Sequence, residues 1–116
     1  FIRISMAIIS SHLLNSLDGT HASGVKIIIN KLSGSGKKIK FAEGITDKNG
    51  RFLKELSLSK KDTKSDFEII FKTAKYFSKK RNVSEIVIRF NMNNSKKKYH
   101  IPVIISPNSY SVWWSR

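Results

Sequence analysis

The chain has 116 residues, 40% of them hydrophobic, which predicts one domain over residues 1–116 with an ordinary hydrophobic core. The absence of cysteine excludes a disulfide scaffold, a thiolate metal site and a cysteine nucleophile. The formal net charge of +14 would suit a nucleic-acid partner, but the lysines are dispersed over loops and strand ends, so we predict a solvated basic surface and no nucleic-acid partner.

The first half of the chain is predicted to form four strands separated by turns. Residues 4–14 are apolar and β-branched, and a turn over residues 17–20 leads into a second strand over residues 25–32. Glycine and serine at residues 34–36 are typical of a hairpin, and residues 38–43 alternate, which indicates a strand with one buried face. A turn over residues 47–50 precedes a fourth strand over residues 51–58.

The second half is predicted to add four strands and one short helix. A polar loop over residues 60–65 is followed by a strand over residues 67–73 and a helix over residues 73–80, with Thr73 as its N-cap. Three further strands are expected over residues 85–92, 99–106 and 110–114. Eight short strands at near-regular spacing favour a mainly β fold, a two-sheet β-sandwich.

The sequence gives no indication of a membrane-spanning segment. No apolar run approaches the ~18 residues of a membrane helix. Residues 1–9 are too short, and too directly joined to the first strand, for an intact signal peptide. We therefore expect a soluble protein of the cytoplasm or the periplasm, with no membrane partner.

Three residues that lie far apart in the sequence carry the candidate chemistry: His12, Arg51 and His100. An imidazole can activate water near neutral pH, and a guanidinium can stabilise a developing oxyanion. Together they suit hydrolysis of a small, anion-forming ring. Taken alone, each of these histidines also fits a half-buried polar position on a strand. His21 follows a turn and is interpreted as a loop residue, and no histidine pair has the spacing of a metal site.

Several short motifs make the chain resemble a known family. They are His12-Leu13-Leu14-Asn15, the run of residues 44–51 that ends in Arg51, the run of residues 71–77, and Tyr99-His100-Ile101-Pro102 followed by Ser106-Pro107. In their order and spacing these motifs resemble the transthyretin-like proteins, and among them the 5-hydroxyisourate hydrolases of uric acid degradation. The resemblance covers most of the chain, from about residue 8 to residue 110.

The resemblance implies a fold, an assembly and an activity. The fold is a transthyretin-type sandwich of two four-stranded sheets with one short helix. The assembly is a homotetramer with active sites in the channel between its dimers. The activity is ring opening of 5-hydroxyisourate by water, without metal or organic cofactor. The family's catalytic histidines correspond to His12 and His100, and its catalytic arginine corresponds to Arg51.

The C-terminal segment departs from that family. The hydrolases end in Tyr-Arg-Gly-Ser, where this chain has Trp113, Trp114, Ser115 and Arg116. Ser115 and Arg116 supply the same chemistry in a shifted register, and they are our candidates for substrate binding. A shift of one residue on a strand, however, turns a side chain to the opposite face.

The same departure keeps a second hypothesis open, a transthyretin-like protein that binds a small ligand without hydrolysing it. The altered ending favours this alternative, and the presence of His12, Arg51 and His100 opposes it. Because adjacent strand residues point to opposite faces, we expect Trp113 and Trp114 to be buried on opposite faces, at a subunit interface or in the channel.

Overall fold

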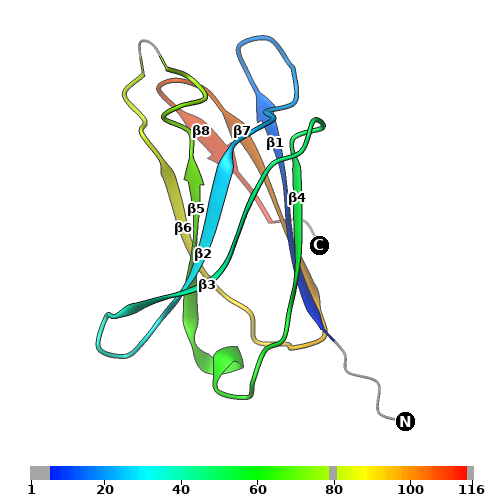
Figure 1. The fold of residues 1–116 in the computed structure, drawn as a ribbon, viewed down its shortest axis with the longest axis vertical. Helices are drawn as coiled ribbons and strands as arrows, with labels where there is room; N and C mark the ends of the chain where they lie inside the picture. The colour runs from blue at the N-terminus through cyan, green and yellow to red at the C-terminus, as the bar shows by residue number, and fades with distance from the viewer. Residues whose placement is uncertain (1–5, 79–80, 115–116) are drawn as a thin grey trace.

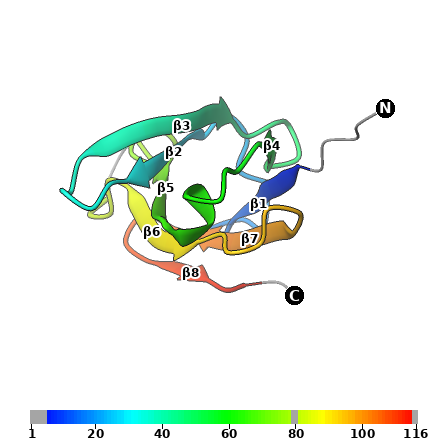
Figure 2. The same ribbon diagram turned by 90° about the horizontal axis from the view of Figure 1, so that it is seen from below.

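The structure is a computed structural model that describes residues 6–78 and 81–114. Within these residues, eight strands form two four-stranded sheets, which face each other as two layers (Figures 1 and 2). The strands are β1 (Ala7–Asn15), β2 (Lys26–Leu32), β3 (Lys38–Ile45), β4 (Arg51–Leu56), β5 (Asp66–Lys72), β6 (Ile86–Asn91), β7 (Lys98–Ile105) and β8 (Tyr110–Val112). The predicted mainly β sandwich of two four-stranded sheets is therefore confirmed.

The two sheets have the strand orders β4-β1-β7-β8 and β3-β2-β5-β6. Within the first sheet, β1 pairs with β4 in antiparallel and with β7 in parallel orientation. This arrangement places residues near position 10, near position 50 and near position 100 side by side on three adjacent strands. Sequence positions separated by up to 90 residues therefore lie on one face of one sheet.

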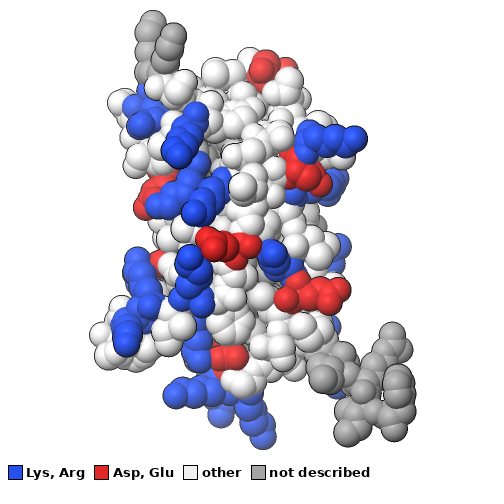
Figure 3. Space-filling model, in the orientation of Figure 1, with Lys and Arg blue, Asp and Glu red and all other residues white. Residues whose placement is uncertain are grey.

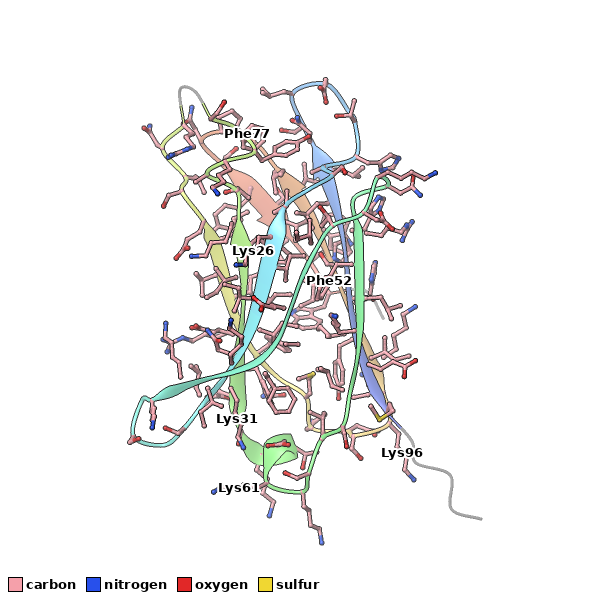
Figure 4. The ribbon with its side chains drawn as sticks, viewed as in Figure 1. Lys26, Lys31, Phe52, Lys61, Phe77 and Lys96 are labelled. Atoms are coloured by element: carbon pink, nitrogen blue, oxygen red, sulfur yellow. The ribbon has the colours of Figure 1, made fainter. Side chains whose placement is uncertain are left out.

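Alternation along the strands separates a core face from an outer face in the first sheet. On β1, Ile9 and Leu13 are fully buried between the sheets, where Phe67 and Phe71 of β5 meet them in one hydrophobic cluster. Phe52 of β4 also lies between the two layers (Figure 4). Burying side chains of this size contributes ~1.5–3 kcal/mol each, so the alternating pattern fixes which residues of β1, β4 and β7 face outward.

The helix predicted over residues 73–80 is wrong across the part that the structure describes. Residues 74–77 form a turn, in which the Phe77 N–H donates to the Thr73 carbonyl oxygen at 3.2 Å. Phe77 is buried and packs edge-on against Tyr76, with ring centroids 5.0 Å apart. A single turn forms too few hydrogen bonds to offset the entropy cost of nucleating a helix. The packing of the two rings stabilises the turn instead. A short 3₁₀ helix is found at Asp62–Lys64, within the predicted polar loop.

The strand ends differ from prediction by a few residues. The fourth strand ends at Leu56 rather than at residue 58, and the eighth ends at Val112 rather than at residue 114. Among the described residues, no helix is long and apolar enough to cross a membrane.

Basic side chains are spread over the surface with acidic ones between them, as the face in Figure 3 shows. Several lysines have carboxylate partners, for example Lys72 with Glu85 at 2.7 Å and Lys38 with Glu68 at 3.1 Å. This distribution agrees with the predicted solvated surface. The absence of a nucleic-acid partner stays a prediction.

Candidate active site

His12, Arg51 and His100 lie on three adjacent strands of the first sheet. His12 is opposite Arg51 in the β1–β4 ladder, and His100 is opposite Ser10 in the β1–β7 ladder. Their sequence neighbours Leu13, Phe52 and Ile101 are buried in the core. By alternation the three candidate side chains therefore point to the outer face of the sheet. The structure brings all three predicted residues together.

A pocket of about 280 Å³ opens on this outer face. It is lined by polar and charged side chains on a partly apolar floor: Ser10, Ser11, Asp47, Arg51, Phe52, Leu53, Lys98 and His100. Two cationic groups, Arg51 and Lys98, thus flank one imidazole. Its size and its two cationic groups suit a small molecule that carries or develops negative charge.

Ser10 holds the imidazole of His100 from the neighbouring strand. The Ser10 hydroxyl oxygen lies 2.8 Å from Nδ1 of His100, and Ser10 is itself buried. A hydroxyl can donate or accept, so this contact is compatible with either tautomer of the ring. It fixes the orientation of the ring and leaves Nε2 for a substrate or water.

The turn before β4 sets the position of Arg51. The Asp47 carboxylate accepts hydrogen bonds from the N–H groups of Asn49 and Arg51, at 2.8 Å and 3.0 Å, and these bonds lower the pKa of Asp47. Gly50 has φ of 71°, and its carbonyl oxygen accepts from the Leu13 N–H at 2.8 Å. This left-handed position favours glycine, and it fastens the Arg51 turn to β1 beside His12.

The surroundings of both candidate histidines lower the pKa and so favour the neutral imidazole. The pKa of His12 is lowered from 6.5 by burial, and further by the nearby Arg51, His21 and His100, against a hydrogen bond with the Asn49 backbone that raises it. The pKa of His100 is lowered by burial, by Lys98 and by Arg51. A neutral imidazole can accept a proton, so both rings are in the form that a general base requires near pH 7.

His21 belongs to this cluster, although the sequence was interpreted as placing it in a loop. Its Nδ1 lies 2.9 Å from Nε2 of His12, and the two rings are stacked with centroids 5.0 Å apart. His21 does lie in the segment between β1 and β2, as interpreted, but its contact with His12 was not predicted. The one hint in the sequence was that His21 follows the turn that comes after the strand of His12. A turn alone does not show that the loop folds back onto that strand.

The C-terminal residues are described as far as Trp114. Ser115 and Arg116, the predicted substrate-binding residues, lie outside the described residues. Within the single chain Trp113 and Trp114 are half-exposed, at 46% and 44%. The Trp113 N–H donates to the Pro102 carbonyl oxygen of β7, whereas the Trp114 ring packs against Phe90 of β6 at 5.7 Å between centroids. Their burial against a partner subunit stays a prediction.

Trp114 also lines a larger pocket, about 420 Å³, together with Arg89, Lys97 and Tyr99. This pocket contains no histidine and no carboxylate, so it offers no side chain that exchanges protons near neutral pH. The smaller pocket at His100 is therefore the better candidate for catalysis, although it is not the largest. Among the described residues no group of three histidine, cysteine or acidic side chains is placed to hold a metal ion.

Comparison with known proteins agrees with this architecture. The model of the HIUase/Transthyretin family matches residues 9–114. A 5-hydroxyisourate hydrolase of Salmonella dublin is 31% identical over 109 residues, which cover 91% of this chain and 79% of that protein. The chain therefore belongs to the HIUase/Transthyretin family.

Solved structures share the fold. The 5-hydroxyisourate hydrolase of Klebsiella pneumoniae superimposes with a TM-score of 0.76 at 21% identity, covering 96% of this chain and 100% of that one. Sea bream transthyretin, solved in complex with thyroxine, gives a TM-score of 0.80 at 19% identity, covering 92% of this chain and 93% of that one. At these identities the likeness establishes the sandwich, and the choice between hydrolysis and binding rests on the site residues.

Proposed function

We propose that this protein hydrolyses 5-hydroxyisourate, opening its ring by attack of water on an amide-type carbonyl. The observation that carries the proposal is the outer-face cluster of His12, Arg51 and His100 beside a pocket of about 280 Å³. Two neutral imidazoles and one guanidinium are the groups that such a reaction needs. The 31% identity to a protein with this activity supports the same substrate.

Arg51 would act on the carbonyl that is attacked. It lies at the start of β4, directly opposite His12, and its guanidinium lines the pocket. As water adds to the carbonyl, negative charge develops on the oxygen, and a planar donor placed beforehand stabilises that charge more than it stabilises the ground state. Lys98, on the other side of the pocket, adds a second positive charge that attracts an anionic substrate.

His12 and His100 would share the proton transfers. One imidazole takes a proton from the attacking water, the other orients that water, and the proton that was taken up is then returned to the departing ring nitrogen. Both pKa values are lowered, so both rings are able to accept a proton near neutral pH. The chemistry is carried by side chains alone, and we propose that no metal or organic cofactor takes part.

The proposed assembly is a homotetramer with this outer face lining the channel between dimers. Two apolar side chains support it, because Leu53 and Trp113 are 55% and 46% exposed in the single chain. Large apolar side chains left in solvent on a sheet face are typical of an association surface. Sedimentation of the purified protein tests the assembly, and a monomer at micromolar concentration would contradict it.

The function is tested by following the ultraviolet absorbance of freshly generated 5-hydroxyisourate with and without the protein. Faster decay that is lost in a variant with His12 and His100 both replaced by Ala supports hydrolysis. Decay at the spontaneous rate, together with saturable binding of a urate-like ring, would instead favour the alternative of a non-catalytic binding protein. The half-exposed Trp113 and Trp114 are the feature that favours this alternative, since aromatic rings bind planar ligands well.

A further inference from the structure

His21 is an exposed residue held in a fixed position next to His12. The backbone on both sides of it is bonded to β1: the Asn15 N–H donates to the Thr20 carbonyl oxygen at 2.8 Å, and the Ala22 N–H donates to the Leu13 carbonyl oxygen at 2.9 Å. His21 itself forms an isolated antiparallel bridge with Leu14. The loop therefore places the imidazole of His21 by the same strand that carries His12.

The contact between the two rings restricts their protonation. With Nε2 of His12 only 2.9 Å from Nδ1 of His21, one of these two nitrogens carries a proton and the other accepts it, because two facing N–H groups would repel each other. The hydrogen bond therefore links the tautomer of His12 to that of His21. Stacking, with an interplanar angle of 26°, fixes the plane of the His12 ring as well.

The surroundings of His12 contain no competing acidic partner among the described residues. The groups that act on it are Arg51 from β4, His100 from β7, His21 from the loop and the backbone of Asn49 from the turn. Catalytic imidazoles are commonly oriented by a third group that bonds the nitrogen not used in chemistry. A carboxylate often has this role, and here a second imidazole occupies the corresponding place.

We propose that His21 is the positioning residue of His12: its Nδ1 hydrogen-bonds Nε2 of His12, ties the tautomer of that ring to its own and holds the ring in one orientation. His21 acts through His12 and does not itself contact the reacting atoms. The inference rests on the proposed function for its kinetic consequence. Its structural part, the hydrogen bond that ties the two rings together, stands apart from any activity.

The experiment compares three variants of the full chain. His21→Phe keeps a ring that can stack but removes the hydrogen bond. His21→Asn removes the ring but keeps a polar group close to the position of Nδ1. Ser23→Ala changes an exposed residue of the same loop and serves as the control. Each variant is examined by the kinetics of 5-hydroxyisourate decay and by ¹⁵N NMR of the histidine rings over pH.

We expect His21→Phe to lower kcat about tenfold, equivalent to ~1.4 kcal/mol, with KM changed less than about twofold. His21→Asn should recover most of that loss, and Ser23→Ala should match the parent. In the NMR spectra the parent should show Nε2 of His12 in a hydrogen bond, and His21→Phe should lose that bond and change the balance of His12 tautomers. The pKa of His12 should rise in both His21 variants, because His21 lowers it.

A His21→Phe variant with parental kcat and an unchanged balance of His12 tautomers would overturn the inference. A kinetic loss that His21→Asn does not recover, with the tautomer unchanged, would also overturn it, because the loss would then come from packing. If the parent itself fails to accelerate decay, the proposed function fails, and the NMR comparison alone decides whether His21 positions His12.

Discussion

His12 and Arg51 occupy directly opposed positions across the antiparallel pair β1 and β4, on the outer face of their sheet. Residues opposed in this way have Cβ atoms about 4.5–5.5 Å apart. The Asp47–Gly50 turn fastens the pair, since the Gly50 carbonyl accepts from the Leu13 N–H on the far side of His12. The proposed base and the proposed oxyanion donor are thus held by the sheet itself.

Replacement of Arg51 by Lys tests the need for a planar donor. Arg51→Lys should fold like the parent, because Arg51 is exposed and its fixed interactions are made by its backbone. Its activity should fall, because an ammonium is a point charge without the two-pronged geometry of a guanidinium. Loss of one oxyanion donor lowers kcat about 10²–10³-fold. Decay kinetics measure the effect, and parental kinetics in Arg51→Lys would place Arg51 outside the catalytic machinery.

The two histidines give a second prediction. His12→Ala and His100→Ala should each lower kcat by ~10²–10⁴-fold, the usual contribution of a general acid or base. Ser10→Ala should have a smaller effect, because it removes only the 2.8 Å contact that orients His100. Circular dichroism and sedimentation control for folding and assembly. Activity near the parental level in both Ala variants would show that these residues do not carry the reaction.

The sequence predicted the sandwich because alternation and turn residues are local signals, and burial on a sheet enforces them. It also predicted His12, Arg51 and His100, each of which lies in a recognisable motif. It missed the contact between His21 and His12, which depends on how the loop between β1 and β2 folds back onto β1.

Other misses have the same physical origin. The helix expected over residues 73–80 has local propensity, but the burial of Phe77 and its packing against Tyr76 favour a single turn. The support of His100 by Ser10 joins residues 90 positions apart, through the parallel pairing of β1 with β7. No spacing along the chain encodes such a pairing.

Gly50 provides a stability prediction. A Cβ at this position would overlap the Leu13 carbonyl oxygen, and φ is 71°. Gly36 has a similar φ of 83° but open space around its Cβ position. Gly36→Ala should therefore lose only the ~1–2 kcal/mol of a left-handed alanine, and Gly50→Ala should lose more, because β1 and the turn must also move apart. Urea denaturation compares the two, and equal losses would rule out the steric contribution.

Stability should depend on pH through the two candidate histidines, His12 and His100. Their pKa values are lower in the folded protein than the ordinary 6.5, so the unfolded chain binds more protons as the pH falls below that value. The free energy of unfolding is thus highest above about pH 6.5 and decreases toward pH 5. The pKa values of the Asp47 and Glu68 carboxyls are also lowered, but these groups change the free energy of unfolding only at lower pH.

Urea denaturation at pH 7.5 and pH 5.5 measures this dependence. The variant with Ala at both His12 and His100 should show a flatter dependence than the parent, and the difference between the two isolates the contribution of these two histidines. An identical change in the free energy of unfolding between the two pH values, in parent and variant, would contradict the lowered pKa values.

The last prediction concerns the C-terminal segment. Trp113 bonds the backbone of Pro102, which is opposite His12 in the β1–β7 ladder, so position 113 continues the row of residues that contains His12. By the resemblance to the hydrolases, the half-exposed Trp113 corresponds to the Tyr of the Tyr-Arg-Gly-Ser ending, and Trp114, which packs on Phe90, corresponds to its Arg. We expect that restoring Tyr-Arg-Gly-Ser at positions 113–116 raises the rate of 5-hydroxyisourate decay, because it returns an arginine and a serine to the places where the hydrolases carry them.

A double change to Ala at Trp113 and Trp114 is the control, since it removes the indoles without adding those groups. If the rate rises equally in this control, the effect comes from removing the bulky indole side chains. If the rate does not rise in a variant that carries Tyr-Arg-Gly-Ser and still assembles, the C-terminal ending does not limit catalysis.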